Sequence, residues 1–191
     1  MPEQILSTAV AEPPNRAHPP TVSRKGLMAD GSDTAFREML HNLLAFSARL
    51  EQIRQRFGTY LGLSGVQYTL LVSIRQLQGD DGVGVRALAD HLGLSAPFVT
   101  VETTKLVNQG IVTKRANPED LRRVLLCVSE RGRDLLASLW PMQAEINDLL
   151  FDPIDEDNFR QVREMAEALR VSSEKALALS DYLLTQERGR A

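Results

Sequence analysis

The chain has 191 residues, of which 43% are hydrophobic and 25% charged, with a single cysteine and a formal net charge of −3. This composition supports one domain with a buried core, excludes an internal disulfide and disfavours a generally basic nucleic-acid binder. No apolar run approaches the ~20 residues of a membrane span, and the N-terminus lacks the apolar core of a signal peptide, so we expect a soluble, cytoplasmic protein with no membrane partner.

Residues 1–32 are predicted to form a flexible arm. They contain five prolines and few large apolar side chains, so they cannot bury enough surface to order themselves. Contact with DNA or another anionic surface is open to its basic side chains, Arg16, His18, Arg24 and Lys25, although a plain disordered tail is the simpler interpretation.

An amphipathic helix is predicted over residues 33–57. Its apolar residues follow the a and d positions of a heptad, at Phe36, Met39, Leu43, Phe46, Leu50, Ile53 and Phe57. A helix of this kind needs a partner surface, so Phe36, Met39 and Leu43 are candidates for a dimer interface. We expect the segment 58–62, which begins and ends with glycine, to end the helix.

The next helix is predicted over residues 65–77, because Ser64 and Gln67 form a capping-box pattern at its start. The Gly- and Asp-rich residues 79–84 then form a loop, which a brief strand at 83–85 would fit.

Residues 85–110 have the pattern of two short helices joined by a tight turn. Gly93 lies just past the first helix, where a left-handed residue is favoured. Ser95 is a natural N-cap for the second helix, Pro97 falls in its first turn, and Gly110 ends it. This is the layout of a helix-turn-helix.

A β-hairpin with a charged tip follows. Residues 111–114 and 124–128 favour strands, and Asn-Pro-Glu-Asp at 117–120 favours a turn. Between Lys105 and Arg133 there are seven Lys or Arg residues against three acids, a local charge of +4 that leaves −7 on the rest of the chain. Such a patch indicates a surface for one polyanion, with an ordinary charged hairpin as the alternative.

Two more helices are predicted after the hairpin. Ser129 caps one that runs to about residue 150, is kinked by Pro141, and faces inward through Leu135, Leu139, Ile146 and Leu149. The last, about residues 155–184, carries one seam of apolar and small residues, at Phe159, Val162, Ala166, Leu169, Ser173, Ala176, Ser180 and Leu183.

Two stretches resemble a known family: LGLSAPFVTVETTKLVNQGIV (92–112) and NPEDLRRVLLCVSERGRDLL (117–136). They resemble the MarR-type (multiple antibiotic resistance) regulators, which are homodimeric winged-helix transcription factors, and the likeness spans about residues 63–139. Its most specific part is the wing, with Asp120, Arg122, Ser129 and Gly132. The resemblance implies a dimer interface that joins the first and last helices, with Phe159, Leu169 and Leu183 as candidates.

We therefore expect a mainly α fold with a small β-hairpin wing, in which a winged helix-turn-helix is flanked by long dimerisation helices. The expected parts are the arm (1–32), a helical dimerisation region (33–62 and 149–191), and a DNA-binding lobe with its connecting helix (63–148). The resemblance implies a homodimeric repressor on a pseudo-palindromic double-stranded operator with half-sites roughly 10 base pairs apart.

In such a protein the second helix of the helix-turn-helix lies in the major groove. Because Val99, Thr103 and Leu106 must face the core, the residues left for DNA are Ser95, Ala96, Pro97, Thr100, Val101, Thr104 and Lys105. Many family members have arginine at the position of Val101 and a polar or basic residue at Ala96. Contacts of methyl groups with thymine methyls are therefore expected here in place of arginine–guanine pairs.

The wing is expected to supply the second DNA contact, through Lys114, Arg115, Asp120, Arg122 and Arg123. The resemblance implies that Arg122 enters the minor groove and that Asp120 holds it in place. Glu102 departs from the family, where leucine is common. A carboxylate near the core needs a partner, and pairing with Arg86, pairing with Lys105 or an outward path to solvent are all open.

The resemblance also implies that a small aromatic acid, or its thioester, modulates DNA binding. By position Phe46, Arg49, Tyr68 and Trp140 are candidates to line its site, with Arg49 opposite a carboxylate. The alternative is that they are ordinary core or surface residues. Cys127 is not near the start of the long helices, where the family's peroxide sensors carry a reactive cysteine, so we expect an inert thiol.

Two other classes of protein were weighed. An enzyme is disfavoured, because no histidine lies in a nucleophile motif and no phosphate-binding glycine loop appears. Glu38-x-x-His41 has di-metal spacing but lacks a second pair, so we expect no catalytic residue, metal or cofactor. A helical dimeric ligand-binding or scaffold protein without DNA binding is the remaining alternative.

Overall fold

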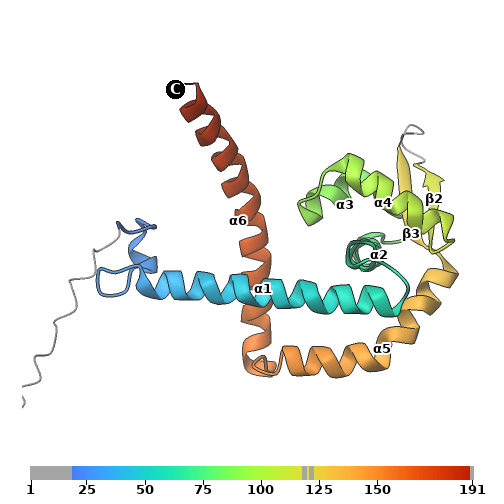
Figure 1. Cartoon of the computed structure of the whole chain (residues 1–191), viewed down its shortest axis with the longest axis horizontal. Coiled ribbons are helices and arrows are strands. Elements are labelled where there is room, and N and C mark those ends of the chain that lie inside the picture. The colour runs from blue at the N-terminus through green and yellow to red at the C-terminus, as the bar shows by residue number, and fades with distance from the viewer. Residues whose placement is uncertain (1–18, 118–119, 121–122, 190–191) are drawn as a thin grey trace, which may run out of the picture. The chain divides into compact units, whose positions relative to one another are not determined.

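The computed structural model describes residues 19–117, 120 and 123–189, and it divides into two compact units, residues 1–50 and 51–191. Its elements in chain order are η1 (Lys25–Leu27), α1 (Thr34–Tyr60), α2 (Gly65–Leu77), β1 (Val83–Gly84), α3 (Val85–Leu92), α4 (Ala96–Asn108), β2 (Val112–Ala116), β3 (Val124–Val128), α5 (Glu130–Leu150) and α6 (Glu156–Arg188) (Figure 1). The predicted mainly α fold with a small β wing is confirmed.

The first unit holds the start of α1 and the segment before it. Asp33, just ahead of the helix, accepts hydrogen bonds from the N–H and hydroxyl of Thr21, at 2.7 and 2.8 Å, and pairs with Arg37 at 3.2 Å. The hydrogen bonds from Thr21 hold the pKa of this carboxyl below its ordinary value. Residues 1–18 of the predicted arm lie outside the described residues, so the flexibility of the arm stays a prediction.

The α1–α2 corner differs from the prediction in one respect. We expected Gly58 to begin a helix break, but α1 continues to Tyr60. The reason is a tertiary contact: a Cβ on Gly58 would lie 2.7 Å from the Ser64 carbonyl oxygen, so the glycine allows α2 to start against α1. Gly62, with φ +70°, makes the turn instead.

The second unit contains a winged lobe around one hydrophobic core. β3 is the central strand of a three-stranded antiparallel sheet in the order β1-β3-β2, so the brief strand that would fit the loop does form. Gly82 brings the loop close to the sheet, because a Cβ there would lie 2.7 Å from Cys127 Sγ. The residues buried at this core include Phe57, Tyr68, Leu70, Leu71, Ile74, Leu88, Val99, Leu106, Leu126 and Leu139.

The two C-terminal helices contribute unequally to that core. Leu136 and Leu139, near the start of α5, are buried, but Leu149 is 81% exposed although we expected it to face inward. The prediction was wrong because the core ends near Leu139 and leaves the end of α5 without a surface to pack on. The described α6, residues 156–188, has no buried residue.

Candidate nucleic-acid interface

α4 turns one face to the core and the other to solvent. Its start is capped by Ser95, whose hydroxyl accepts a hydrogen bond from the Phe98 N–H at 3.4 Å, and Pro97 lies in the first turn. Of the seven residues predicted to face the groove, five are exposed, while Ala96 and Thr104 are half-buried. The sequence pattern therefore places the solvent-facing side of this helix well.

The threonine hydroxyls on this face donate to the helix backbone. Thr100 Oγ1 donates to the Ala96 carbonyl at 2.8 Å, and Thr104 Oγ1 donates to the Thr100 carbonyl at 2.7 Å. Because a hydroxyl has one proton to give, these side chains present methyl groups and acceptor oxygens to solvent. Such a surface suits thymine methyls better than base-edge acceptors.

Glu102 is buried on α4 and has two partners. Its Oε2 accepts from Gln67 Nε2 at 3.1 Å, and its Oε1 accepts from Lys105 Nζ at 2.6 Å. The hydrogen bond from Lys105 holds the pKa of Glu102 below its ordinary value and outweighs the opposing effect of burial. Of the two partners left open by the sequence, Lys105 is therefore the one in place, while Arg86 pairs with Asp90 at 3.8 Å.

The basic residues of β2 connect the wing to other parts of the lobe. Lys114 Nζ donates to Thr104 Oγ1 on α4 at 3.0 Å. Arg115 donates through Nε to the Asp81 carbonyl at 2.8 Å and through Nη2 to the Asp80 carbonyl at 2.7 Å. Lys114 thus joins the wing to α4, and Arg115 joins it to the loop that follows α2.

The described residues of the wing tip are joined by short-range contacts. The Asn117 N–H donates to the Arg123 carbonyl at 2.9 Å, and the Arg123 N–H donates to the Asp120 carbonyl at 2.8 Å. Arg123 Nε also lies 3.1 Å from the Asp120 carboxylate. Arg122 lies outside the described residues, so its minor-groove contact and its pairing with Asp120 stay predictions.

Ser129 and Gly132 fix the base of the wing. Ser129 Oγ lies 2.7 and 2.9 Å from the carbonyl oxygens of Gly110 and Ile111, and it accepts from the Gly132 N–H at 3.0 Å. A Cβ on Gly132 would run into the Ile111 carbonyl oxygen. This part of the wing signature therefore holds α5 against the start of β2.

Two residues near this surface were not predicted. Phe98 is 40% exposed on the first turn of α4, although an aromatic residue there reads as core in the sequence. Gln67 was assigned only to the capping box, yet its side-chain amide also reaches Glu102. The capping pattern was readable in the sequence, whereas a contact 35 residues away was not.

Comparison with known proteins agrees with this geometry. The model of the MarR family matches residues 63–124, from just before α2 to the start of β3. This chain is a MarR-type winged helix-turn-helix protein. The resemblance drawn from the sequence is thus confirmed, while no curated protein matches the sequence.

Solved structures of this fold are similar to the MarR-type chain at low identity. A MarR transcriptional regulator from Methanosarcina mazei Go1 is 23% identical, over 74% of this chain and 99% of that one, with a TM-score of 0.54. The S. aureus MepR–DNA complex is 16% identical, over 71% and 96%, at 0.55. CouR from Rhodococcus jostii RHA1 bound to p-coumaroyl-CoA is 21% identical, over 69% and 91%, at 0.58. At these identities the likeness shows the fold.

The candidate dimer residues of the MarR-type chain are largely exposed. In the first unit, Met39 and Leu43 are exposed and Phe36 is half-buried. In the second unit, the large apolar side chains exposed along α6 are Phe159, Val162, Met165, Leu169, Val171, Leu177, Leu179, Tyr182, Leu183 and Leu184. Phe159 and Val162 also line an open apolar cleft of about 620 Å³ at the α5–α6 corner.

The candidate ligand residues have different environments. Tyr68 is 2% exposed, its ring stacks edge-on with Phe57 at 5.7 Å, and its hydroxyl accepts from Gln143 Nε2 at 3.1 Å. Burial raises the pKa of this hydroxyl. Trp140 is 68% exposed on α5. Phe46 and Arg49 belong to the first unit, where Arg49 Nη1 donates to the Ala45 carbonyl at 3.0 Å.

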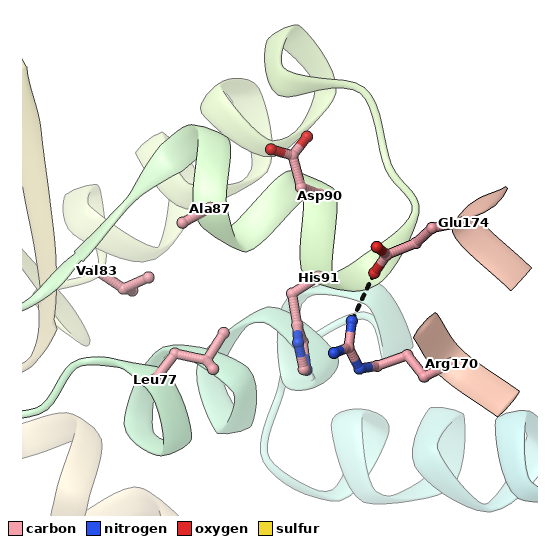
Figure 2. Close-up of a pocket in the computed structure, with 7 residues that line it drawn as sticks. All are labelled: Leu77, Val83, Ala87, Asp90, His91, Arg170 and Glu174. Carbon is pink, nitrogen blue, oxygen red and sulfur yellow. Dashed lines mark hydrogen bonds and ion pairs between the residues drawn. The ribbon is translucent and has the colours of Figure 1, made fainter. Parts of the chain in front are cut away.

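A separate cleft of about 340 Å³ lies beside α3. Figure 2 shows Asp90 and His91 of α3 on one side, and Arg170 and Glu174 of α6 on the other. The two α6 residues form an ion pair, with Arg170 Nη1 2.5 Å from Glu174 Oε1. The floor is apolar, with Leu77, Val83 and Ala87. None of the candidate ligand residues lines this cleft.

Two further searches bear on the alternatives. Within the described residues, no cluster of His, Cys, Asp and Glu side chains could hold a metal ion. Among the helices of the described residues, none is both long and apolar enough to cross a membrane.

Proposed function

We propose that this protein is a homodimeric, sequence-specific DNA-binding transcriptional regulator that acts as a repressor. The observation that carries the proposal is the bond between Lys114 of the wing and Thr104 of α4, at 3.0 Å. It makes the wing and the exposed side of α4 parts of one surface, which is what a duplex contacts when a helix enters the major groove and a wing flanks it. The MepR–DNA complex, of similar fold, supports the proposal.

The operator is expected to be read mainly through thymine methyl groups. The groove-facing side of α4 offers Val101, which is 55% exposed, together with Pro97 and the methyl of Thr100. Replacing thymine by deoxyuridine removes only the methyl group, so it should weaken binding by about 1 kcal/mol or more where a contact is lost. Two recognition helices would read half-sites roughly 10 base pairs apart.

Dimerisation is proposed with a second copy of the chain as the partner. The exposed apolar residues of α6 form too long a row for isolated surface residues, and rows of this kind mark interaction sites. Phe159, Leu169 and Leu183 lie in that row, and Phe36, Met39 and Leu43 of α1 are proposed to join the same interface. The domain division made from the sequence follows the same proposal.

A small aromatic acid or its thioester is proposed to modulate DNA binding, as the p-coumaroyl-CoA bound to CouR suggests for a protein of this fold. A ligand that fits only one arrangement of the dimer shifts the population away from the DNA-competent one. Trp140 is the only tryptophan and is exposed, so its fluorescence reports on a ligand nearby. Titration with benzoates, cinnamates and their thioesters should quench it, and Arg49→Ala should weaken the response.

Selection of genomic fragments on the full chain tests the DNA proposal directly. A fragment that is enriched and contains an inverted repeat is the expected result. On that fragment, Arg122→Ala should weaken binding by about 1–3 kcal/mol in a band-shift titration. Arg163→Ala, which removes an exposed arginine from α6, is the matched control and should leave affinity unchanged. Equal affinities of all three proteins would exclude the wing from the interface.

The alternative is a dimeric ligand-binding or scaffold protein without DNA binding. The apolar side of α4 favours it, because Val101 lies where many family members carry arginine. Failure of the full chain to enrich any fragment, at salt concentrations where basic winged helices still bind, would decide for this alternative.

A further inference from the structure

The buried carboxylate of Glu102 stands next to the proposed DNA-reading surface. Its side chain is 12% exposed, and both oxygens are engaged, by Gln67 at 3.1 Å and by Lys105 at 2.6 Å. Placing a carboxylate in such a position costs free energy unless it is paired and hydrogen-bonded. A leucine would fill the same space without that cost, so the acid needs a reason beyond packing.

Gln67 determines how the carboxylate is held. Its side-chain oxygen accepts from the Ser64 N–H at 3.1 Å, and its own N–H donates to Ser64 Oγ at 3.2 Å. The amide is thereby fixed at the start of α2 with its NH₂ group toward Glu102. One carboxylate oxygen is thus held by a fixed donor, which leaves the other to orient Lys105.

Lys105 lies at the edge of the exposed side of α4. Its side chain is 52% exposed although its ammonium contacts Glu102. An ammonium has three protons to donate, and Glu102 takes one of them. The other two remain available, but the positive charge is compensated and the side chain no longer moves freely.

We propose that Glu102 is a specificity-determining residue that converts Lys105 from a mobile phosphate-binding cation into a fixed donor to a base edge. The inference rests on the proposed DNA-binding function. A free lysine beside the groove raises affinity for any sequence, because it neutralises a phosphate and releases a counterion. A lysine fixed by a carboxylate does so much less and discriminates through guanine O6 and N7 or thymine O4, the acceptors that the major groove exposes.

The test is the salt dependence of DNA binding by Glu102→Gln. This variant keeps the shape of the side chain and releases Lys105. On duplexes of random sequence the slope of log K against log salt should steepen by about 1 per chain, and affinity at low salt should rise. The ratio of operator to random-sequence affinity should fall by roughly tenfold, the size of one lost base-edge contact.

Three further variants complete the design. In Glu102→Gln/Lys105→Gln the extra slope should disappear, because the released cation is gone. Glu145→Gln removes an exposed acid from α5, makes the same change in net charge, and should leave the slope unchanged. Glu102→Met needs no polar partner and should also steepen the slope, which keeps the test valid if the glutamine variant folds poorly; circular dichroism monitors the fold of each.

The outcomes separate the inference from the function it rests on. If Glu102→Gln and Glu102→Met bind operator and random DNA more weakly with the wild-type slope, Glu102 only supports the fold and the inference is overturned, while DNA binding stands. If the wild-type chain binds no DNA at all, the proposed function fails and this inference fails with it.

Discussion

The winged lobe and α6 use their apolar side chains in opposite ways. In the lobe, residues from α2, α3, α4, β3 and α5 bury one another; Leu70, Leu106 and Leu126 are fully buried. In the described α6, residues 156–188, none is buried, and Leu169 and Leu183 are about half exposed. A lone chain therefore accounts for the fold of the lobe but gives the long helix no reason to be apolar. The difference indicates that the lobe is specified by its own core and α6 by a second molecule.

The largest expected effect is on the core of the lobe. Leu106→Ala removes a fully buried side chain and should lower the free energy of unfolding by about 2–5 kcal/mol. Chemical denaturation followed by circular dichroism measures it. Because the core lies within one chain, the loss should not depend on protein concentration. A loss below about 1 kcal/mol would mean that the lobe is not self-sufficient.

Gly132→Ala should have the next largest effect. The new methyl group would meet the Ile111 carbonyl oxygen, so the strand or α5 must shift, at a cost of about 1–3 kcal/mol. Thermal unfolding measures it. Gly26→Ala, where nothing lies near the new methyl group, is the control and should leave the melting temperature almost unchanged. Equal melting temperatures for both variants would contradict the close approach at the base of the wing.

Leu169→Ala sharpens the comparison from the other side. It is the same chemical change as Leu106→Ala, but at an exposed site of α6. It should weaken dimer association by up to about 2 kcal/mol per chain while leaving the stability of the lobe unchanged. Sedimentation velocity over a range of protein concentrations measures the dissociation. An unchanged dissociation constant would remove Leu169 from the interface.

The smallest expected effect is the pH dependence set by Glu102. Its pKa in the folded chain lies below its ordinary 4.5, chiefly because of the hydrogen bond from Lys105, so its stabilising contribution is complete above the unfolded-state pKa. That contribution is lost as the pH falls through the folded-state pKa. The difference in melting temperature between wild type and Glu102→Gln should therefore be constant from pH 7 to about 5 and shrink below about 4.5. A difference that persists unchanged at pH 3 would contradict the pairing.

The sequence predicted best where one residue determines the local backbone. Gly93 has φ +65° and Ser95 caps α4, so the turn and both helix boundaries follow from residue type. It failed at Gly58, because the reason for that glycine is the Ser64 carbonyl on another helix. It also failed at Leu149, because periodicity shows which face of a helix is apolar but not where the core ends.

The candidate site shows the same limit in its charges. Counting basic residues predicted a positive patch but not that Arg115 is bound to the carbonyls of Asp80 and Asp81, or that Lys105 is bound to Glu102. These partners come from elements far apart in the sequence or from a choice of side-chain geometry. The order of helices and the wing could be predicted because each is encoded locally, whereas the network that positions the basic side chains is tertiary.

The central claim is that two copies of the chain hold two winged lobes on one face of a duplex. Sedimentation equilibrium of the full chain with a selected operator, combined with hydroxyl-radical footprinting, tests it most directly. The account predicts two chains per duplex and two protected regions roughly 10 base pairs apart on the same face. One chain per duplex, or protection on opposite faces, would contradict it.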